Sequence, residues 1–231
     1  MPEFLDIKNL DAGYGRCQVL FGVNIAIPAR GGVAVLGRNG AGKSTLMKAI
    51  VGELPTWSGK VHFDGRDIDR RRTEERVRAG IGYVPQEHAV FARLSVRENL
   101  AVGSIFRADA SAVERVMAMF PKLGQRLHQP AGTLSGGERK MLAIGRAMLG
   151  NPKLLLLDEP TEGVWIGVIE ELTERLSELA REIAVIIVEQ HLDLAIRVAG
   201  QAYVLDRGRV ALSGPSQQLR EDPRLLTYLA P

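Results

Sequence analysis

Residues 37–44 have the residue types of a phosphate-binding loop. They read Gly-Arg-Asn-Gly-Ala-Gly-Lys-Ser, which matches G-x-x-x-x-G-K-[ST] between an apolar run and a helical pattern. Glycines let the backbone turn its N–H groups toward phosphate oxygens, and the helix N-terminus adds partial positive charge. Lys43 is expected to reach the β and γ phosphates, Ser44 to offer its hydroxyl to Mg²⁺, and Thr45 to bond the α phosphate. The predicted nucleotide-binding residues of this segment are Gly37, Asn39, Gly40, Ala41, Gly42, Lys43, Ser44 and Thr45.

Two acidic residues follow a second apolar run. The run 154–157 is all leucine and ends at Asp158 and Glu159, and open α/β sheets bind their ligands at the C-terminal ends of strands. Phosphoryl transfer needs one acid near the metal and one group that orients and deprotonates a water. Asp158 is therefore expected on the Mg²⁺ side, and Glu159 is the candidate catalytic base. Alone, the pair would be interpreted as solvated turn acids; the phosphate loop favours the catalytic interpretation.

A third motif, Leu134-Ser-Gly-Gly-Glu138, opens another helical pattern. Ser135 and Glu138 have the spacing of a capping box. That spacing does not explain Gly136 and Gly137, which cost up to about 1 kcal/mol each relative to alanine within a helix. Bare backbone at a helix N-terminus can accept phosphate, so Ser135, Gly136 and Gly137 are predicted to form a second, lysine-free phosphate site.

These motifs require an α/β architecture. Short β-rich runs alternate with amphipathic stretches, which is typical of βα units on a sheet. The last four of the five expected strands are apolar enough to be buried on both faces, as central parallel strands are. The expected strands are 33–36, 81–84, 154–157, 184–188 and 202–206, and the expected helices are 43–51, 110–120, 136–149, 168–182, 192–199 and about 225–229.

Between Gln86 and Gly132 the strand signal disappears while helical periodicity persists. The segments SVRENLAVG and ASAVERVMAMF carry that periodicity. We therefore expect one domain over residues 1–231, with a small helical subdomain inserted at about residues 87–132. The arginine run 70–72 is interpreted as a solvated turn before a helix.

Composition excludes several other classes of protein. The 231 residues contain 30 Lys and Arg against 27 Asp and Glu, a net charge of +3 that is too small to indicate nucleic-acid binding. One cysteine, Cys17, cannot form an internal disulfide. The opening MPEFLDIKNL lacks the apolar core of a signal peptide, and the apolar runs are far shorter than a membrane span. The expected compartment is cytosolic or cytosol-facing.

The motifs together resemble those of the nucleotide-binding subunit of an ATP-binding-cassette (ABC) transporter, over essentially the whole length. The resemblance implies a P-loop NTPase fold with a mostly parallel core sheet, an N-terminal antiparallel β region and the inserted helical subdomain. It also implies ATP and Mg²⁺ as cofactors, and a head-to-tail dimer in which the LSGGE-type signature of one subunit closes over the ATP of another. In that family, hydrolysis of the ATP reopens the dimer.

The same resemblance assigns further site residues. Gln86, in the run Tyr-Val-Pro-Gln, matches the glutamine loop, which touches Mg²⁺ and leads into the helical subdomain. Tyr14 matches the aromatic residue that stacks on adenine, with Val19 beside it. Tyr14 could equally be a core tyrosine.

Within the family, the short helical insertion and the runs 91–100 and 187–190 are most similar to the ATPases of branched-chain amino-acid uptake systems and their urea or short-amide relatives. The run Asp158–Gly163 is more similar to the urea and amide branch.

The resemblance also implies partners, which are transmembrane permease subunits, an identical or paralogous ATPase subunit and, indirectly, an extracytoplasmic binding protein. The chain would be peripheral at the cytoplasmic face of the inner membrane. Phe91 and Leu94 are candidates for the permease interface, or for the core of the helical subdomain.

Two departures from the family pattern stand out. Val164, Trp165 and Ile166 occupy the positions where Leu, Asp and Pro usually stand in the intersubunit loop. The position of the usual switch histidine falls on Gln190 rather than His191, so Gln190 is the expected γ-phosphate contact. His191 would take that role if the preceding strand ended one residue later.

Two rival functions are considered, a nearer one and one from another class. One is the ATPase of a lipid or lipopolysaccharide exporter, whose glutamine-loop region is similar. The other is a soluble ABC-type ATPase in translation or DNA repair, but such proteins usually carry two cassettes or a long coiled-coil insertion. A GTPase is disfavoured because no N-K-x-D guanine-reading motif is present. The transported substrate is left open.

Overall fold

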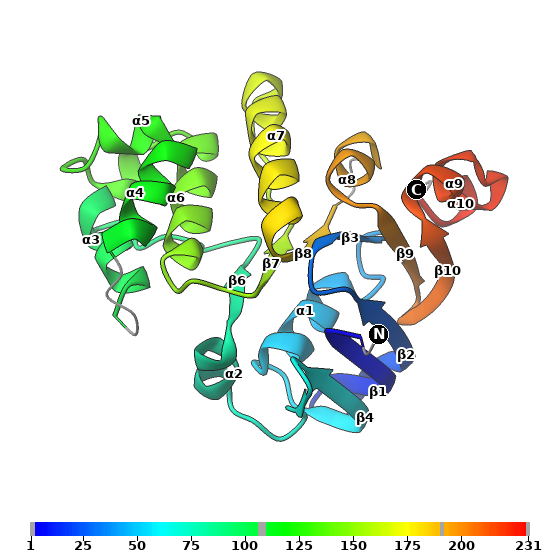
Figure 1. The fold of residues 1–231 in the computed structure, drawn as a ribbon. Helices are drawn as coiled ribbons and strands as arrows, with labels where there is room; N and C mark the ends of the chain where they lie inside the picture. The colour runs from blue at the N-terminus through cyan, green and yellow to red at the C-terminus, as the bar shows by residue number, and fades with distance from the viewer. Residues whose placement is uncertain (1–2, 106–109, 190–191, 230–231) are drawn as a thin grey trace.

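A computed structural model describes residues 3–105, 110–189 and 192–229 of the chain. It contains two β-sheets, with α1 (Lys43–Val51) on one face of the larger sheet and α7 (Ile166–Glu182) and α8 (Leu192–Val198) on the other (Figure 1). This arrangement confirms the α/β class, with an antiparallel sheet and a mixed sheet of mainly parallel strands. The fold matters to function because it brings the ends of several strands together.

The larger sheet has six strands in the order β10-β9-β3-β8-β7-β6. The pairs of β3 with β8 and β9, and of β7 with β6 and β8, are parallel, whereas β10 pairs antiparallel with β9. Its strands are β3 (Gly31–Leu36), β6 (Ile81–Val84), β7 (Leu154–Asp158), β8 (Ala184–Val188), β9 (Gln201–Asp206) and β10 (Arg209–Pro215).

Two of the strands expected to be buried on both faces depart from that prediction. Every residue of β7 and β8 is buried, as expected. In β6, however, Gly82 and Tyr83 are half-buried because β6 lies at the edge of the sheet, and in β9 Tyr203 and Asp206 are half-buried. The apolar composition of 81–84 did not reveal that β6 is an edge strand, because a strand's place in the sheet depends on which strands pair.

The smaller sheet is antiparallel and comes from the N-terminal part of the chain, as the family resemblance implied. Its strands run in the order β2-β1-β4-β5, and their alternating burial places one face against α1 and the larger sheet. The strands are β1 (Leu5–Tyr14), β2 (Cys17–Ile27), β4 (Thr56–Phe63) and β5 (Arg66–Asp67).

Four helices pack together at one end of the molecule, on the left of Figure 1, and we call them the helical group. They are α3 (Val96–Gly103), α4 (Ala110–Met119), α5 (Pro121–Gly124) and α6 (Gly136–Met148). The helix α6 lies beyond the predicted insertion at 87–132 and yet packs against α3 and α5. Buried residues of the helical group share one core with the sheet and α7.

The remaining helices complete the molecule. They are α2 (Thr73–Ala79), α7 (Ile166–Glu182), α8 (Leu192–Val198), α9 (Ser216–Glu221) and α10 (Pro223–Leu229). The arginine run 70–72 is exposed and leads directly into α2, as predicted. Within the described part of the chain, we find no helix with the length and apolarity that crossing a membrane requires.

Candidate functional site

The predicted phosphate-binding loop lies at the carboxyl edge of the parallel strands, where it meets residues that follow β6 and β7. A cleft of about 440 Å³ opens there. Its walls bring the phosphate loop, Gln86 and Glu159 together, although these segments are far apart in the sequence. The lining residues are Val19, Asn39, Gly40, Gly42, Lys43, Ser44, Thr45, Gln86 and Glu159.

The loop has the backbone geometry that its glycines permit. Gly42 has φ 105° at the N-cap of α1, and a Cβ there would lie 2.9 Å from Leu20 Cδ2. A side chain at this position would therefore be both strained and crowded. Lys43 is 4% exposed, and its Nζ donates to the carbonyl oxygens of Gly37 at 2.8 Å and Arg38 at 3.0 Å. The ammonium group thus lies across the mouth of the loop.

Glu159 points its carboxylate into the same cleft. Its backbone has φ 47°, an uncommon left-handed conformation for a residue other than glycine. The Glu159 N–H donates to the Val188 carbonyl at 2.9 Å, which holds this turn at the end of β7. Glu159 Oε1 lies 3.6 Å from Lys43 Nζ, and both side chains are buried. The arrangement can place a base beside a bound phosphate.

Asp158 is the last residue of β7, and its buried side chain is hydrogen-bonded to Ser44. Burial raises the pKa of the Asp158 carboxyl and neighbouring Glu159 raises it further, while a hydrogen bond from Ser44 and the charge of Lys43 oppose the shift. Among the residues that the structure describes, Asp158 Oδ1 has no hydrogen-bond partner. A buried, unpartnered carboxylate oxygen beside a serine hydroxyl fits a hard divalent cation such as Mg²⁺, which prefers oxygen ligands.

Gln86 reaches the cleft from the loop after β6. Its Nε2 donates to Glu159 Oε2 at 3.0 Å and to Glu162 Oε2 at 2.8 Å. The amide therefore links the candidate base to a second acid that the sequence reading did not single out. Glu162 was missed because nothing local distinguishes it from a solvated loop acid.

Glu189, directly after β8, is a second residue that the sequence reading missed. It is 2% exposed, and its Oε1 accepts from the Thr161 N–H at 3.1 Å and the Thr161 hydroxyl at 2.7 Å. Its position at the end of an apolar strand, like that of Asp158, is a signal that could have found it. The adjacent Gln190 and His191 lie outside the described residues, so the assignment of Gln190 stays a prediction.

Tyr14 is 46% exposed at the end of β1, which excludes the alternative that it is a core tyrosine. Lys48 Nζ lies 6.0 Å from the centre of the Tyr14 ring. Of the two residues predicted to contact adenine, Val19 lines the cleft and Tyr14 is not among its lining residues.

Ser135 caps α6 in the predicted capping box. Its hydroxyl accepts from the Glu138 N–H, and Glu138 Oε2 accepts from the Ser135 N–H at 2.9 Å. The glycines have a packing reason that the sequence did not reveal: a Cβ on Gly136 would lie 2.9 Å from the Gly163 oxygen, and one on Gly137 2.5 Å from Val168 Cγ1. Of the described residues, none from 135–137 lines the phosphate-loop cleft, so one chain does not bring the two phosphate sites together.

The intersubunit-loop departure is a prominent surface feature. Trp165 is the N-cap of α7 and is 73% exposed, and Ile166 beside it is 64% exposed. Only Val164 separates them from Gly163, whose carbonyl approaches Gly136 at the start of α6. Trp165 is thus two residues from the segment that meets the predicted second phosphate site.

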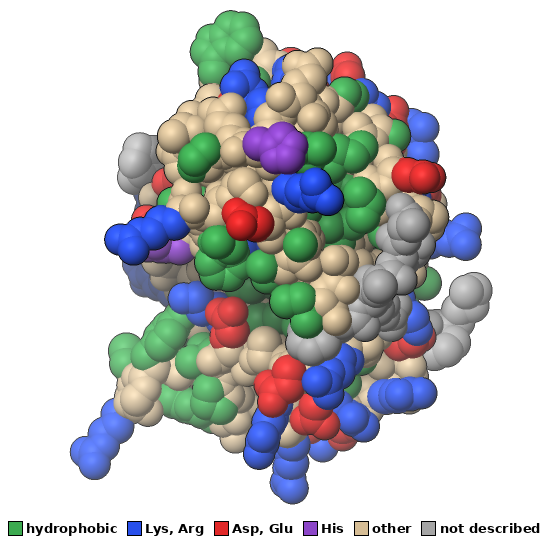
Figure 2. Space-filling view, turned by 90° about the vertical axis from the view of Figure 1, so that its left-hand side faces the viewer, with side chains coloured by type: hydrophobic (Ala, Val, Ile, Leu, Met, Phe, Trp, Pro, Cys, Tyr) green, Lys and Arg blue, Asp and Glu red, His purple; other side chains and the backbone are tan. Residues whose placement is uncertain are grey.

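A separate groove of about 370 Å³ runs between the helical group and α2, beside β6. Phe91 lines it and is 50% exposed, with the Arg146 guanidinium 4.9 Å from its ring centre, whereas Leu94 is half-buried. Figure 2 views the molecule from this side and shows hydrophobic side chains gathered where the helical group meets the rest. Exposed Phe91 favours the interface interpretation over the core one.

The comparison with known families covers the phosphate loop, Gln86, the start of α6 and the two acids at the end of β7. The family model described as ABC transporter matches residues 20–162, more than half of the chain. The chain belongs to the ABC transporter family. It is an ATPase of the ABC type and binds ATP, as the domain and its relatives do.

Two relatives illustrate the range within that family. This ABC ATPase is 38% identical over 225 residues to the high-affinity branched-chain amino acid transport ATP-binding protein BraG of Pseudomonas aeruginosa, covering 96% of this chain and 97% of that protein. It is 36% identical over 228 residues to the lipopolysaccharide export system ATP-binding protein LptB of Escherichia coli, covering 94% of this chain and 93% of that protein.

Solved structures agree with the fold. A nucleotide-free ATP-binding cassette from an ABC transporter matches with a TM-score of 0.88 and 26% identity, covering 100% of both chains. The ADP conformation of another ATP-binding cassette matches with a TM-score of 0.85 and 28% identity, covering 99% of this chain and 98% of that chain.

Proposed function

We propose that this ABC ATPase powers a bacterial importer for branched-chain amino acids or for urea and short amides. The observation that carries the proposal is 38% identity to BraG over nearly the full length of both chains. The urea and amide branch rests on the sequence Asp-Glu-Pro-Thr-Glu-Gly at 158–163. ATP hydrolysis on this chain would supply the energy, and the substrate would be chosen by other subunits.

Glu159 is proposed as the base that takes a proton from the attacking water. Its carboxylate lies in the phosphate-loop cleft and is oriented by Gln86 Nε2 at 3.0 Å. Lys43, 3.6 Å from Glu159, would move its ammonium group onto the β and γ phosphates and stabilise charge on the transferring group. Burial of both side chains strengthens these electrostatic interactions.

Ser44, Gln86 and Asp158 are the residues proposed to hold Mg²⁺. When bound, the cation would neutralise charge on the β and γ phosphate oxygens. The support is the unpartnered buried Oδ1 of Asp158 among the described residues and its contact with Ser44. Tyr14 and Val19 are proposed to bind the adenine, with Tyr14 stacking on the base.

Ser135, Gly136 and Gly137 are proposed to bind the γ phosphate of ATP held by a second subunit. Their place at the N-terminus of the 13-residue helix α6, away from the cleft of their own chain, supports a head-to-tail dimer. That second subunit would be an identical copy or a paralogue.

The groove beside Phe91 is proposed to receive the permease subunits, which would hold the chain at the cytoplasmic face of the inner membrane. Its apolar lining next to the glutamine loop supports this role. An extracytoplasmic binding protein would act on the complex indirectly.

Export of lipopolysaccharide is a second candidate, favoured by 36% identity to LptB. Co-purification of the chain with its membrane subunits, followed by ATP-dependent uptake of leucine or urea into proteoliposomes, tests the first proposal. We expect uptake of leucine or urea with the wild-type chain and loss of that uptake with Glu159→Gln. Capture of lipopolysaccharide-binding membrane subunits, without uptake, would replace the importer with the exporter.

A further inference from the structure

Lys140 bridges two loops that carry the proposed chemistry. Its Nζ donates to the main-chain carbonyl of Gln86 at 2.9 Å and to that of Glu159 at 3.1 Å. One ammonium group therefore sets the spacing between the glutamine loop and the end of β7. The side chains of Gln86 and Glu159 are themselves hydrogen-bonded at 3.0 Å, so Lys140 closes a ring of contacts around the candidate base.

The surroundings of Lys140 are strongly acidic. Burial lowers the pKa of its ammonium group, and the negative charges around it oppose that shift. Those charges belong to Glu162, Glu189, Asp158 and Glu159. Attraction to these acids holds the ammonium group among them, so the Lys140 side chain ties α6 to the loops that carry them.

Lys140 stands on α6, one turn after the glycines of the second phosphate site. The helix begins at Gly136 with Ser135 as its cap, so the phosphate site and Lys140 move together as parts of one helix. A displacement of α6 would therefore pull directly on the carbonyls of Gln86 and Glu159.

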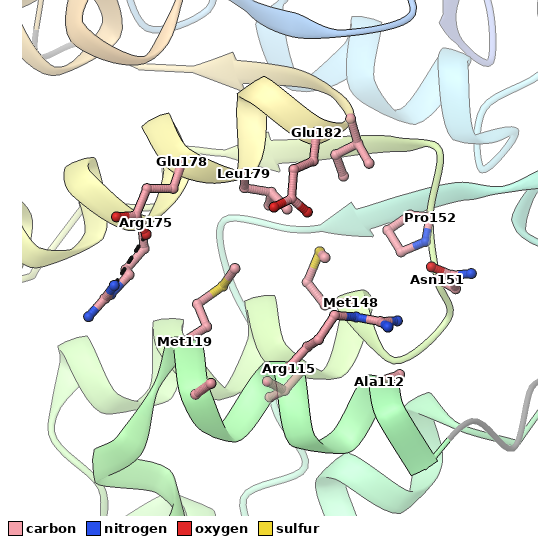
Figure 3. Close-up of a pocket in the computed structure, with 13 residues that line it drawn as sticks. Ala112, Arg115, Met119, Met148, Asn151, Pro152, Arg175, Glu178, Leu179 and Glu182 are labelled. Carbon is pink, nitrogen blue, oxygen red and sulfur yellow. Dashed lines mark hydrogen bonds and ion pairs between the residues drawn. The ribbon is translucent and has the colours of Figure 1, made fainter.

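Although α6 packs directly on α7 within a shared core, the helical group leaves a hollow beside that contact. This hollow of about 510 Å³ separates α4 from α7, with Met119 and Met148 pointing into it (Figure 3). Away from this hollow, Lys122 links α5 to α7, with its Nζ 2.6 Å from Glu171 Oε2. Lys140 differs from Lys122 because its partners are the catalytic loops.

We infer that Lys140 is a positioning residue that makes the geometry of Glu159 depend on the position of α6. When the start of α6 binds the γ phosphate of ATP held by a second subunit, the position of α6 would then fix the position of Glu159 in this subunit. The two ATP sites of a dimer would be coupled in this way. This inference rests on the proposed ATPase site and head-to-tail dimer, and it goes beyond them by naming the residue that joins the sites.

The test compares four proteins: wild type, Lys140→Met, Lys140→Arg and Lys122→Met. We expect kcat for ATP hydrolysis to fall about 10- to 100-fold in Lys140→Met, the cost of a misplaced catalytic group, with the KM for ATP within about twofold of wild type. Lys140→Arg should recover most of the loss because it keeps a donor and the charge. Lys122→Met, which removes a lysine link away from the catalytic loops, should keep wild-type kcat.

Measuring ATP-dependent dimerisation distinguishes a positioning role of Lys140 from damage to the fold in Lys140→Met. In a Glu159→Gln background, Lys140→Met should still dimerise with ATP, as measured by light scattering, because the phosphate contacts are retained. A kcat within twofold of wild type in Lys140→Met, an equal loss in Lys122→Met, or loss of the dimer would overturn the role of Lys140. If Lys140→Met does not fold, Lys140→Gln takes its place, because one donor remains. Turnover that does not depend on Glu159 would instead overturn the proposed function.

Discussion

The conformation of Glu159 connects backbone strain with chemistry. A left-handed backbone at a residue other than glycine costs about 1 to 3 kcal/mol and persists where the surroundings hold it. Here φ is 47°, and the N–H is held by the Val188 carbonyl at 2.9 Å. The turn directs the carboxylate toward Lys43 instead of along the strand.

Glu159→Gln should keep ATP binding and slow steady-state hydrolysis by about 10² to 10⁴, the range for losing a general base. The amide keeps the size of the side chain but cannot accept the proton. Phosphate release at saturating ATP, together with an ATP-binding titration, measures both effects. Glu87→Gln, in an exposed acid of the neighbouring loop, is the control. Normal turnover in Glu159→Gln would move the base to another residue.

Asp158→Asn should remove the stabilisation that Mg²⁺ and ADP give, without destabilising the protein in their absence. Because burial raises the pKa of Asp158, its ionised form lowers the stability of the fold increasingly as pH rises through that pKa. A neutral amide avoids that cost at pH 7 and is a poorer cation ligand. Thermal denaturation with ADP, with and without Mg²⁺, gives the comparison. An unchanged Mg²⁺-induced shift in Tm would exclude Asp158 from the metal site.

At the scale of elements, the start of α6 serves packing as well as the proposed phosphate contact. Gly137 is buried against Val168 on α7, so this turn of α6 approaches α7 as closely as the backbone permits. The absence of side chains at 136 and 137 therefore permits close helix contact, and the proposed phosphate contact would use the same bare turn of backbone.

Gly137→Ala should destabilise the protein by about 1 to 3 kcal/mol, the usual cost of overpacking. The added Cβ would lie 2.5 Å from Val168 Cγ1. Val168→Ala removes that atom, so the double variant should be more stable than the sum of the single effects predicts. Urea denaturation of the four proteins of this cycle gives the coupling. Strict additivity would show that the two residues do not clash.

Ser135→Arg should leave ATP binding by the isolated subunit nearly intact and prevent ATP-dependent dimerisation of the Glu159→Gln protein. Ser135 is exposed at the cap of α6 and lies outside the phosphate-loop cleft of its own chain. A bulky side chain there would obstruct the second subunit. Sedimentation with and without ATP decides the question, and an undiminished dimer would refute the shared γ phosphate.

At the scale of the whole molecule, a buried arginine joins parts of the chain that surround α1. Arg76, on α2, is 2% exposed, and its Nη1 donates to the carbonyls of Ala49 and Ile50 at 2.8 Å each. Nη2 donates to the Asp69 carbonyl at 2.9 Å. The guanidinium thus satisfies carbonyls at the C-terminal end of α1 and holds α2 and the loop that precedes it against α1.

Arg76→Met should lower the free energy of unfolding by about 1.5 to 3 kcal/mol or more, because buried carbonyls lose their donor. This is the value for one hydrogen bond to a charged group, and Arg76 makes several. The midpoint of urea denaturation measures the change. Arg72→Met, whose arginine side chain is 82% exposed, should be nearly neutral and is the matched control. Equal midpoints for the two variants would show that burial of Arg76 contributes nothing.

Much of the fold was predictable because its strongest signals are local. The helix 43–51 and the strand 184–188 have the predicted bounds, since each follows from a contiguous pattern. The N-terminal strands were expected as a region from family resemblance, but their bounds were not predicted. Their residues pair with partners up to 58 positions away, as Leu5 does with Phe63, and pairing of that kind leaves little trace in local composition.

The sequence by itself determined the parts of the site that are contiguous: the phosphate loop, the acids Asp158 and Glu159, and the capped glycine start of α6. Backbone conformation and helix caps depend on neighbouring residues, so motifs specify them. Tertiary structure alone decided that Gln86 meets Glu162 and that Lys140 bridges Gln86 and Glu159. These contacts span 19 to 76 residues, and they exist because parallel strands, ordered by long-range pairing, bring their carboxyl ends to one edge of the sheet.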